Sequence, residues 1–320
     1  MSLESRIAKN TGLQKSYIER LIRRAPRSYK TYTIPKRTGG SRTIHHPSSE
    51  LKILQRWIAR HIFEKMPVHA DVYSYRPDHD IRKHALRHQR NNYLLRLDLQ
   101  NFFPSIRAVD IREFLRKNSE HIGFEIDEND LNSICQITCW KNGAAEDNRL
   151  CLTIGAPSSP VISNVILFDL DSKLAQICML LGVTYTRYAD DLYFSTNEPN
   201  VLTALFRIVR ETIEDQESPR LRINVDKTVF TSRKHRKVIT GLVISSENKI
   251  SLGREKKRFY RSLIYKFIRN ELPPEEISRV RGLINFAFQV DRAFARSVID
   301  KYGVDVLARL QIGNLDKYVI

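Results

Sequence analysis

Residues 183–196 read VTYTRYADDLYFST, and this stretch decides the fold class. Two segments rich in β-branched and aromatic residues flank Ala189, Asp190 and Asp191, a pattern that predicts two strands joined by a tight turn. Two adjacent aspartates at the tip of such a turn repel each other unless a cation lies between them. By itself the pair is also compatible with a solvated turn, because Asp is common in turns.

A second stretch carries a charge in an apolar setting. Residues 93–99 read YLLRLDL, which predicts a buried strand with Asp98 near its end. A buried carboxylate is costly unless it is paired or binds a metal, although Asp98 could instead cap the turn that follows. If this strand lies beside the predicted hairpin, Asp98 joins Asp190 and Asp191 as a set of the oxygen ligands that Mg²⁺ prefers. The backbone carbonyl of Leu99 is expected to add a further ligand. Two Mg²⁺ ions about 4 Å apart can activate a 3′ hydroxyl and neutralise a leaving pyrophosphate.

The rest of the chain alternates predicted helices and strands. Helices are expected as two short pieces over 3–24, over 49–66, 80–89, 110–117, 128–140, 155–180 and 200–215, and from 254 onward; strands are expected over 29–44, 221–225 and 238–244. The second N-terminal helix is expected to open with a capping box from Ser16 to Glu19. The strands over 29–44 are expected to turn at Gly39 and Gly40. Strands surrounded by helices in mixed order indicate an α+β architecture.

The charge is strongly and unevenly basic. The 320 residues are 42% hydrophobic, which is enough for a core and excludes a disordered chain or a coiled coil. Lys and Arg number 53 against 36 Asp and Glu, a net charge of +17. Residues 1–60 hold 14 Lys and Arg against 3 Asp and Glu, and residues 233–269 hold 12 against 2. Two basic flanks around a slightly acidic middle suit an enzyme that acts on nucleic acid, although a basic surface can also serve solubility alone.

Cysteine spacing and hydropathy place the protein in a reducing, aqueous compartment. The four cysteines show no CxxC spacing, and a zinc site from Cys135, Cys139 and Cys151 is a minor alternative. The N-terminus has no signal-peptide core, and no stretch approaches 18 apolar residues. We therefore expect a soluble, cytoplasmic protein that has no membrane partner.

Several motifs resemble the conserved blocks of reverse transcriptases. The segments YTRYADDL at 185–192 and LDLQNFFPSI at 97–106 are similar to the catalytic blocks. Four further blocks follow the family's order: IPKRTGGSRTIHHPSSELKILQRWI at 34–58, GAPSSPVISN at 155–164, LRINVDKT at 221–228 and TGLVIS at 240–245. The resemblance implies a right-hand polymerase with an antiparallel palm sheet packed on helices and a helical thumb. Its implied divisions are N-terminal helices and fingers at 1–90, palm with fingers insertions at 91–250 and thumb at 251–320.

The resemblance also implies a nucleotide site. Arg42, with Lys36 or Arg37 as helper, would bind the triphosphate of a dNTP, because a guanidinium binds two phosphate oxygens at once. Phe103 matches the residue that lies under the sugar and excludes a 2′ hydroxyl. Lys227 matches the lysine proposed to protonate or neutralise pyrophosphate. The simpler alternatives are a solvated basic hairpin, a core aromatic ring and an exposed lysine at a strand end.

Within reverse transcriptases the chain is similar to the enzymes of bacterial retrons. APSSP at 156–160, ITGLVIS at 239–245 and RGLINFAF at 281–288 carry this likeness, which implies copying of a cognate structured non-coding RNA. Synthesis would be primed by a guanosine 2′ hydroxyl and give branched multicopy single-stranded DNA, in anti-phage defence with an effector protein. The family's NAxxH element falls at 84–88, where His84 replaces asparagine and only Ala85 and His88 match. Ile154 replaces a glutamine that is usual in the family, which affects template or nucleotide contacts but not metal chemistry.

Basic and aromatic residues interleave over 233–269, as expected where RNA phosphates and bases are bound. An amphipathic thumb helix with a solvated basic face is the alternative, and His88 could be a histidine satisfied within the core. Two other functions stay open: an intron-type or CRISPR-associated reverse transcriptase, and a non-catalytic RNA-binding scaffold. The residues expected to bind RNA are His88, Arg254, Lys256, Lys257, Arg258 and Arg261.

Overall fold

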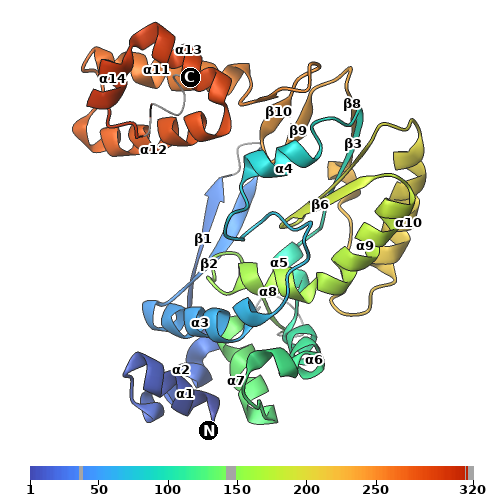
Figure 1. Ribbon diagram of the computed structural model, residues 1–320. Coiled ribbons are helices and arrows are strands. Elements are labelled where there is room, and N and C mark those ends of the chain that lie inside the picture. The colour runs from blue at the N-terminus through green and yellow to red at the C-terminus, as the bar shows by residue number, and fades with distance from the viewer. Residues whose placement is uncertain (36–38, 142–148, 314, 316–320) are drawn as a thin grey trace. The chain divides into compact units, whose positions relative to one another are not determined.

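The computed structural model describes residues 1–35, 39–141, 149–313 and 315 (Figure 1). The chain forms two compact units. The first contains Met1–Pro77, Arg96–Phe194 and Asn200–Val229, and the second contains Asp78–Leu95, Ser195–Pro199 and Phe230–Ile320.

The N-terminal part of the first unit is helical. Helix α1 (Leu3–Thr11) is capped by the Ser2 side chain and ends at Gly12, whose φ of 73° requires a left-handed conformation. Helix α2 (Lys15–Arg24) follows as predicted, but the predicted capping box is wrong, because this helix begins after Gln14. The other helices here are η1 (Ala25–Arg27), α3 (Ser49–His61), η2 (Phe63–Lys65), α5 (Phe102–Ser105), α6 (Ala108–Lys117), η3 (Ser119–Ile122) and α7 (Glu128–Thr138).

The predicted basic hairpin is present. Strands β1 (Tyr29–Pro35) and β2 (Ser41–Pro47) pair antiparallel from Tyr29 opposite Pro47 to Pro35 opposite Ser41. The turn before helix α8 (Ser159–Ile166) packs closely on β2, because the His45 N–H donates to the Ile154 carbonyl at 3.0 Å. Gly155 has a φ of +113°, and a Cβ there would lie 2.8 Å from the His45 carbonyl oxygen. Only glycine fits this approach without strain.

A four-stranded sheet has the order β6-β7-β3-β8, with β6 (Thr184–Tyr188), β7 (Asp191–Thr196), β3 (Tyr93–Asp98) and β8 (Val229–Ser232). Helix α9 (Phe168–Leu180) packs on β6, and helix α10 (Val201–Glu214) packs on α9. The single long helix predicted over 155–180 is instead α8 and α9, separated at the buried Leu167. Hydrophobic periodicity does not reveal this break, since a buried leucine suits either arrangement.

The strand predicted over 221–225 is wrong. Ile223 makes one isolated bridge to Leu99, a short helix η4 (Val225–Lys227) follows, and the strand begins only at Val229. A two-stranded antiparallel pair, β4 (Trp140–Lys141) with β5 (Leu150–Cys151), completes the strands of the first unit.

The second unit combines a small sheet with a helical C-terminal part. Helix α4 (Ile81–Arg87) packs on the antiparallel strands β9 (Lys237–Ile239), β10 (Leu242–Ile244) and β11 (Ile250–Ser251). The strand predicted over 238–244 is therefore two strands, with a turn at Thr240 and Gly241, both at positive φ. Helices α11 (Arg254–Ile268), α12 (Pro274–Val290), α13 (Arg292–Tyr302) and α14 (Val304–Arg309) pack in succession.

Asp291 joins these C-terminal helices to the end of the small sheet. Its carboxylate accepts from the backbone N–H groups of Leu252 and Phe294 at 3.0 and 2.9 Å, and it pairs with Lys257 Nζ at 2.9 Å. The mixture of helices and antiparallel strands confirms the predicted α+β class.

Candidate functional site

The Asp190–Asp191 turn lies beside the end of the Asp98 strand. Ala189 closes β6 in a left-handed conformation with a φ of 55°, so the chain turns sharply into Asp190 and β7. The Leu99 N–H donates to the Asp190 carbonyl at 2.9 Å, which joins the end of β3 to this turn. The first unit thus brings together the three carboxylates that the sequence singled out.

The carboxylate of Asp98 faces a lysine. Lys227 Nζ lies 2.9 and 3.0 Å from the two carboxylate oxygens, and the Asn224 N–H donates to the Asp98 backbone carbonyl at 2.7 Å. The side chain of Asp98 is nearly buried, so this contact supplies a countercharge in a poorly solvated place. The short helix η4 carries Lys227, directly after the segment 221–225 for which the sequence predicted a strand.

The carboxyl groups of Asp190 and Asp191 lie in surroundings that disfavour their charged forms. Burial raises the pKa of Asp190, and the nearby Asp98 raises it further, while Lys227 and Arg42 lower it. Burial also raises the pKa of Asp191 to about 6, against the effect of Arg96, whose Nε lies 3.8 Å from the carboxylate. Groups whose charged form is disfavoured in this way are those that a bound cation would stabilise.

The donor chemistry fits Mg²⁺, because carboxylate oxygens are hard ligands. In the part of the chain that the structure describes, however, no three His, Cys, Asp or Glu side chains are arranged to hold a metal ion as they stand. Asp98 is directed at Lys227, so a metal would have to replace that ammonium group. Cys135, Cys139 and Cys151 form no such arrangement either, and burial raises the pKa of all three thiols, which disfavours thiolate ligands. The zinc alternative is wrong.

The predicted nucleotide-binding residues have different surroundings. Arg42 is exposed on β2 and close enough to Asp190 to lower its pKa. Phe103 is half-buried in α5, with its ring 5.3 Å from that of Phe102, so it is not a fully buried core residue. Lys36 and Arg37 lie outside the described residues.

The sequence interpretation missed Tyr75 and Arg96. Tyr75 has a left-handed backbone, its side chain is 52% exposed, and its pKa is raised by burial and by Asp190. Strained residues in partly exposed positions are common at functional sites, but no periodicity marks them in a sequence. Arg96 carried a usable signal, because it is a charge within the same apolar strand as Asp98.

The predicted RNA-binding residues all belong to the second unit, and His88 is not accessible there. Its side chain is 1% exposed, and its Nδ1 lies 2.6 Å from Ser195 Oγ. This position corrects the expectation of a surface contact with RNA and matches the alternative of a histidine satisfied within the core.

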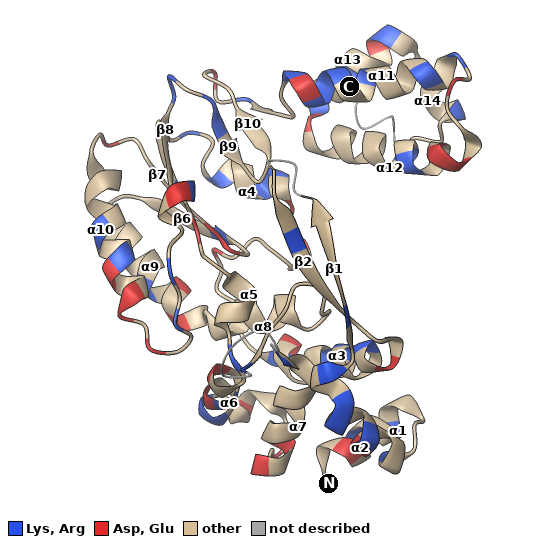
Figure 2. Cartoon of the chain, turned by 180° about the vertical axis from the view of Figure 1, so that it is seen from behind, with Lys and Arg blue, Asp and Glu red and all other residues tan. Residues whose placement is uncertain are grey.

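The basic residues of helix α11 form two groups: some bond to other residues of the second unit, and others are exposed. Lys256 donates to the Gly241 carbonyl at 2.7 Å, Lys257 pairs with Asp291, and Arg261 donates to Ser297 Oγ at 3.1 Å. Arg254 and Arg258 are exposed, as are the rings of Phe259 and Tyr265. Figure 2 shows Lys and Arg on this helix, and also on α2 and α3 of the first unit.

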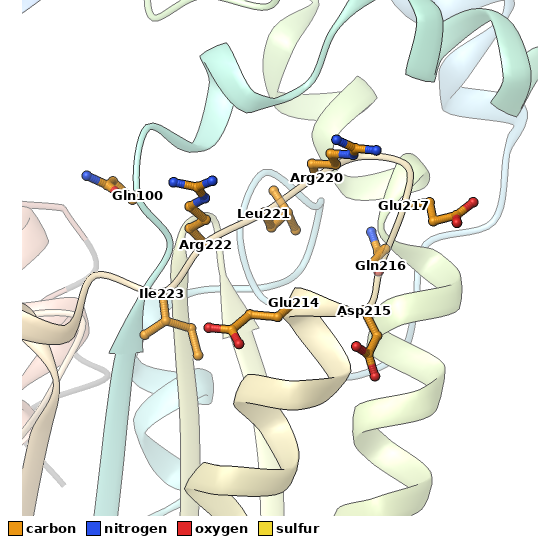
Figure 3. Close-up of a pocket in the computed structure, with 9 residues that line it drawn as sticks. All are labelled: Gln100, Glu214, Asp215, Gln216, Glu217, Arg220, Leu221, Arg222 and Ile223. Carbon is orange, nitrogen blue, oxygen red and sulfur yellow. The ribbon is translucent and has the colours of Figure 1, made fainter.

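A pocket of about 700 Å³ opens beside the end of β3 (Figure 3). None of the predicted site residues lines it. The lining residues are Gln100, Glu214, Asp215, Gln216, Glu217, Arg220, Leu221, Arg222 and Ile223.

In the described residues no helix is both long and apolar enough to cross a membrane.

Comparisons with known proteins agree with this geometry. Residues 34–259 match the family model described as reverse transcriptase (RNA-dependent DNA polymerase). The chain is 36% identical over 304 residues to the Retron Ec83 reverse transcriptase of Escherichia coli. The aligned region covers 94% of this chain and 96% of that protein. It is 31% identical over 312 residues to the Retron Ec73 reverse transcriptase of Escherichia coli, over 94% of this chain and 95% of that protein.

Among solved structures, an apo telomerase from Candida tropicalis has a TM-score of 0.50 and 14% identity, over 91% of this chain and 64% of that chain. This chain spans less than two thirds of the telomerase, and the likeness concerns the fold alone. The mixed helices and antiparallel sheets have the right-hand polymerase fold that was predicted. With the matched family model and the two retron relatives, the chain belongs to the reverse transcriptases of bacterial retrons, which are RNA-directed DNA polymerases.

Proposed function

We propose that this enzyme copies a structured non-coding RNA into single-stranded DNA that stays linked to a guanosine 2′ hydroxyl of that RNA. The observation that carries the catalytic part is the contact of Lys227 with Asp98 beside the Asp190–Asp191 turn. Polymerases of this family need carboxylates for metal ions and a cation near the leaving group, and all four residues lie together in the first unit.

Asp98, Asp190 and Asp191 are the residues that would hold two Mg²⁺ ions, with the Leu99 carbonyl as a further ligand. Bound there, the ions would activate the 3′ or 2′ hydroxyl of the primer and stabilise charge on the transferred phosphoryl group. Lys227 would then turn from Asp98 to the departing pyrophosphate. Because its ammonium group is mobile on a flexible chain, one residue can serve both positions.

Two further residues would select the nucleotide. Arg42, exposed on the hairpin and near Asp190, would bind the triphosphate. Phe103, half-buried beside Phe102, would lie under the sugar and favour dNTPs over NTPs. Lys36 would assist Arg42 from the part of the hairpin for which no structure is described.

Helix α11 is the proposed RNA-binding element of the second unit. Arg254 and Arg258 would contact phosphates, and the exposed rings of Phe259 and Tyr265 would stack on bases. Lys256, Lys257 and Arg261 have contacts inside the unit and are weaker candidates. From the family likeness alone we propose three divisions: fingers at 1–90, palm at 91–250 and thumb at 251–320. The same likeness is the basis for proposing a cytoplasmic location and a role with an effector protein in anti-phage defence.

The test is the nucleic acid extracted from cells that express the chain with its native flanking DNA. We expect a short DNA whose gel mobility changes after debranching enzyme and after RNase. It should disappear in the Asp190→Asn, Asp191→Asn double variant. If no such DNA forms while the purified protein extends a primer on RNA, polymerisation stands and branched priming is wrong. An unchanged product from the double variant would reject the catalytic assignment itself.

A further inference from the structure

The catalytic turn is built on a strained residue. Ala189 has a φ of 55°, which costs energy for any residue with a Cβ, and its side chain is buried. Its conformation sets the direction in which Asp190 leaves the strand. Such a residue keeps its conformation only where its surroundings hold it, so the contacts of Ala189 determine the geometry of the site.

A buried serine holds one side of this residue. Ser74 Oγ accepts a hydrogen bond from the Ala189 N–H at 2.8 Å, and the serine side chain is fully buried. The Ser74 carbonyl in turn accepts from Asn164 Nδ2 at 2.8 Å. Ser74 therefore lies between the catalytic turn and helix α8.

A buried arginine holds the other side. Arg187 Nη1 donates to the Ala189 carbonyl at 3.4 Å and to Asn164 Oδ1 at 3.2 Å. Asp171 fixes this guanidinium with bonds from Nε at 2.8 Å and Nη2 at 2.6 Å. Both the N–H and the carbonyl of the strained residue thus bond to one continuous polar network.

The main chain reinforces the same arrangement. The Arg187 N–H donates to the Asp71 carbonyl at 2.9 Å, and the Tyr73 N–H donates to the Arg187 carbonyl at 2.8 Å. These bonds attach the loop that carries Ser74 to the last residues of β6. The Ser74 hydroxyl consequently has a defined position relative to the turn.

We propose that Ser74 is a positioning residue of the polymerase reaction: it holds Ala189 left-handed and so directs the Asp190 carboxylate toward Asp98. The inference rests on the proposed catalytic role of these aspartates. A purely stabilising role is the competing explanation, since a buried network can raise stability without any effect on geometry. The buried ion pair of Asp171 with Arg187 is weak evidence for net stability, because the cost of removing both charges from water offsets their attraction.

The test compares Ser74→Ala, which removes the acceptor, with Ser74→Thr, which keeps a hydroxyl. Thr138→Val is the matched control, because it removes another buried hydroxyl of the same unit, one that donates within helix α7. For each purified full chain, three quantities are measured: kcat and KM for dTTP on a poly(rA) template with an oligo(dT) primer, Mn²⁺ binding by electron paramagnetic resonance, and the melting temperature.

For Ser74→Ala we expect kcat to fall about tenfold, while KM for dTTP stays within about twofold. Mn²⁺ binding should weaken in the same variant, Ser74→Thr should recover most of kcat, and Thr138→Val should change neither quantity. Unchanged kcat and Mn²⁺ binding in Ser74→Ala would overturn the proposal. The proposal would also fail if kcat and Mn²⁺ binding fell in both Ser74→Ala and Thr138→Val, in each case in proportion to the fall in melting temperature.

Asp190→Asn in the same series separates this inference from the function on which it rests. If Asp190→Asn keeps full activity and Mn²⁺ binding, the catalytic assignment fails, whatever Ser74→Ala shows. If Asp190→Asn loses both while Ser74→Ala keeps both, the assignment stands and only the positioning role is wrong.

Discussion

Lys227 places its ammonium nitrogen within 3.0 Å of both carboxylate oxygens of Asp98, although 129 positions separate the two residues. A lysine in this position competes with any metal ion for the same oxygens. Removing the lysine should therefore lower the Mg²⁺ concentration that the enzyme needs and, at the same time, slow the reaction.

For Lys227→Ala we expect the Mg²⁺ concentration that gives half-maximal activity to fall, because the competing cation is gone. The maximal kcat should also fall, by about 10- to 100-fold, if this lysine helps the pyrophosphate to leave. A Mg²⁺ titration of primer extension measures both effects. Loss of template binding in place of kcat would contradict this assignment.

Phe103→Ala should raise the incorporation of rNTPs relative to dNTPs by about tenfold or more, because the 2′ hydroxyl would gain space. Single-nucleotide extension with dCTP and rCTP gives the ratio. Phe286→Ala, which truncates an exposed phenylalanine of helix α12, is the control and should leave the ratio unchanged. The same ratio in Phe103→Ala and the unaltered enzyme would exclude this residue as the sugar selector.

Two buried histidines predict loss of stability in acid. Burial lowers the pKa of His84 to about 3 and that of His88 well below its usual value. Between the folded and unfolded pKa values, the unfolded chain binds protons that the folded chain excludes, so stability falls as the pH drops below about 6.5. For His84 this loss is about 2 kcal/mol from pH 7 to pH 5, and burial of His88 acts in the same direction.

His84→Asn removes one of these groups and should flatten the dependence of the unfolding free energy on pH below 6.5. Urea unfolding at pH 7 and pH 5 measures the difference. His121→Asn, which changes an exposed histidine, should leave the slope as it was. An equal slope in His84→Asn and the unaltered protein would show that this histidine is protonated when folded.

Gly155→Ala should destabilise the first unit, because a Cβ would lie 2.8 Å from the His45 carbonyl oxygen at a φ of +113°. We expect a loss of about 2 kcal/mol or more. Gly282→Ala is the matched control, since that glycine lies inside α12 with nothing within 4 Å of the added carbon. This change should stabilise by about 0.5–1 kcal/mol, and thermal unfolding of both variants decides.

The two groups of basic residues on α11 should behave differently. Arg254→Gln with Arg258→Gln should weaken RNA binding and reduce the salt slope by about 2, one for each lost phosphate contact. Lys257→Gln should mainly lower stability, because it removes the positively charged partner of the buried Asp291 carboxylate. Filter binding at several salt concentrations, with melting temperatures, separates the two effects. Equal salt slopes in all variants would argue against α11 as the RNA contact.

The catalytic carboxylates could be found in the sequence because their chemistry opposes their surroundings. A charge in an apolar strand and a pair of charges in a turn each require an explanation, and the strand pattern around both is regular. The positions of Lys227 and Ser74 could not be found in this way. Lys227 lies in a short helix over residues 225–227, which the sequence did not predict; the predicted strand over 221–225 ended before this lysine.

Local sequence patterns also could not predict the break between helices α8 and α9 or the two groups of basic residues on α11. The break at Leu167 occurs at a buried apolar residue, so the hydrophobic pattern is the same on either side of it. The exposed and inward-facing basic residues of α11 alternate within one dense run of charge. Their separation depends on Asp291 and Ser297, which belong to later helices.

The distance in sequence between Asp98 and its lysine has a consequence for synthesis on the ribosome. Asp98 emerges before its countercharge exists, and the loop with Ser74 emerges earlier than the turn that it holds. Until residue 227 has left the exit tunnel, the nascent chain contains the aspartates without the arrangement proposed to make them catalytic. The order of synthesis therefore makes the Asp98–Lys227 contact one of the last parts of the first unit to form.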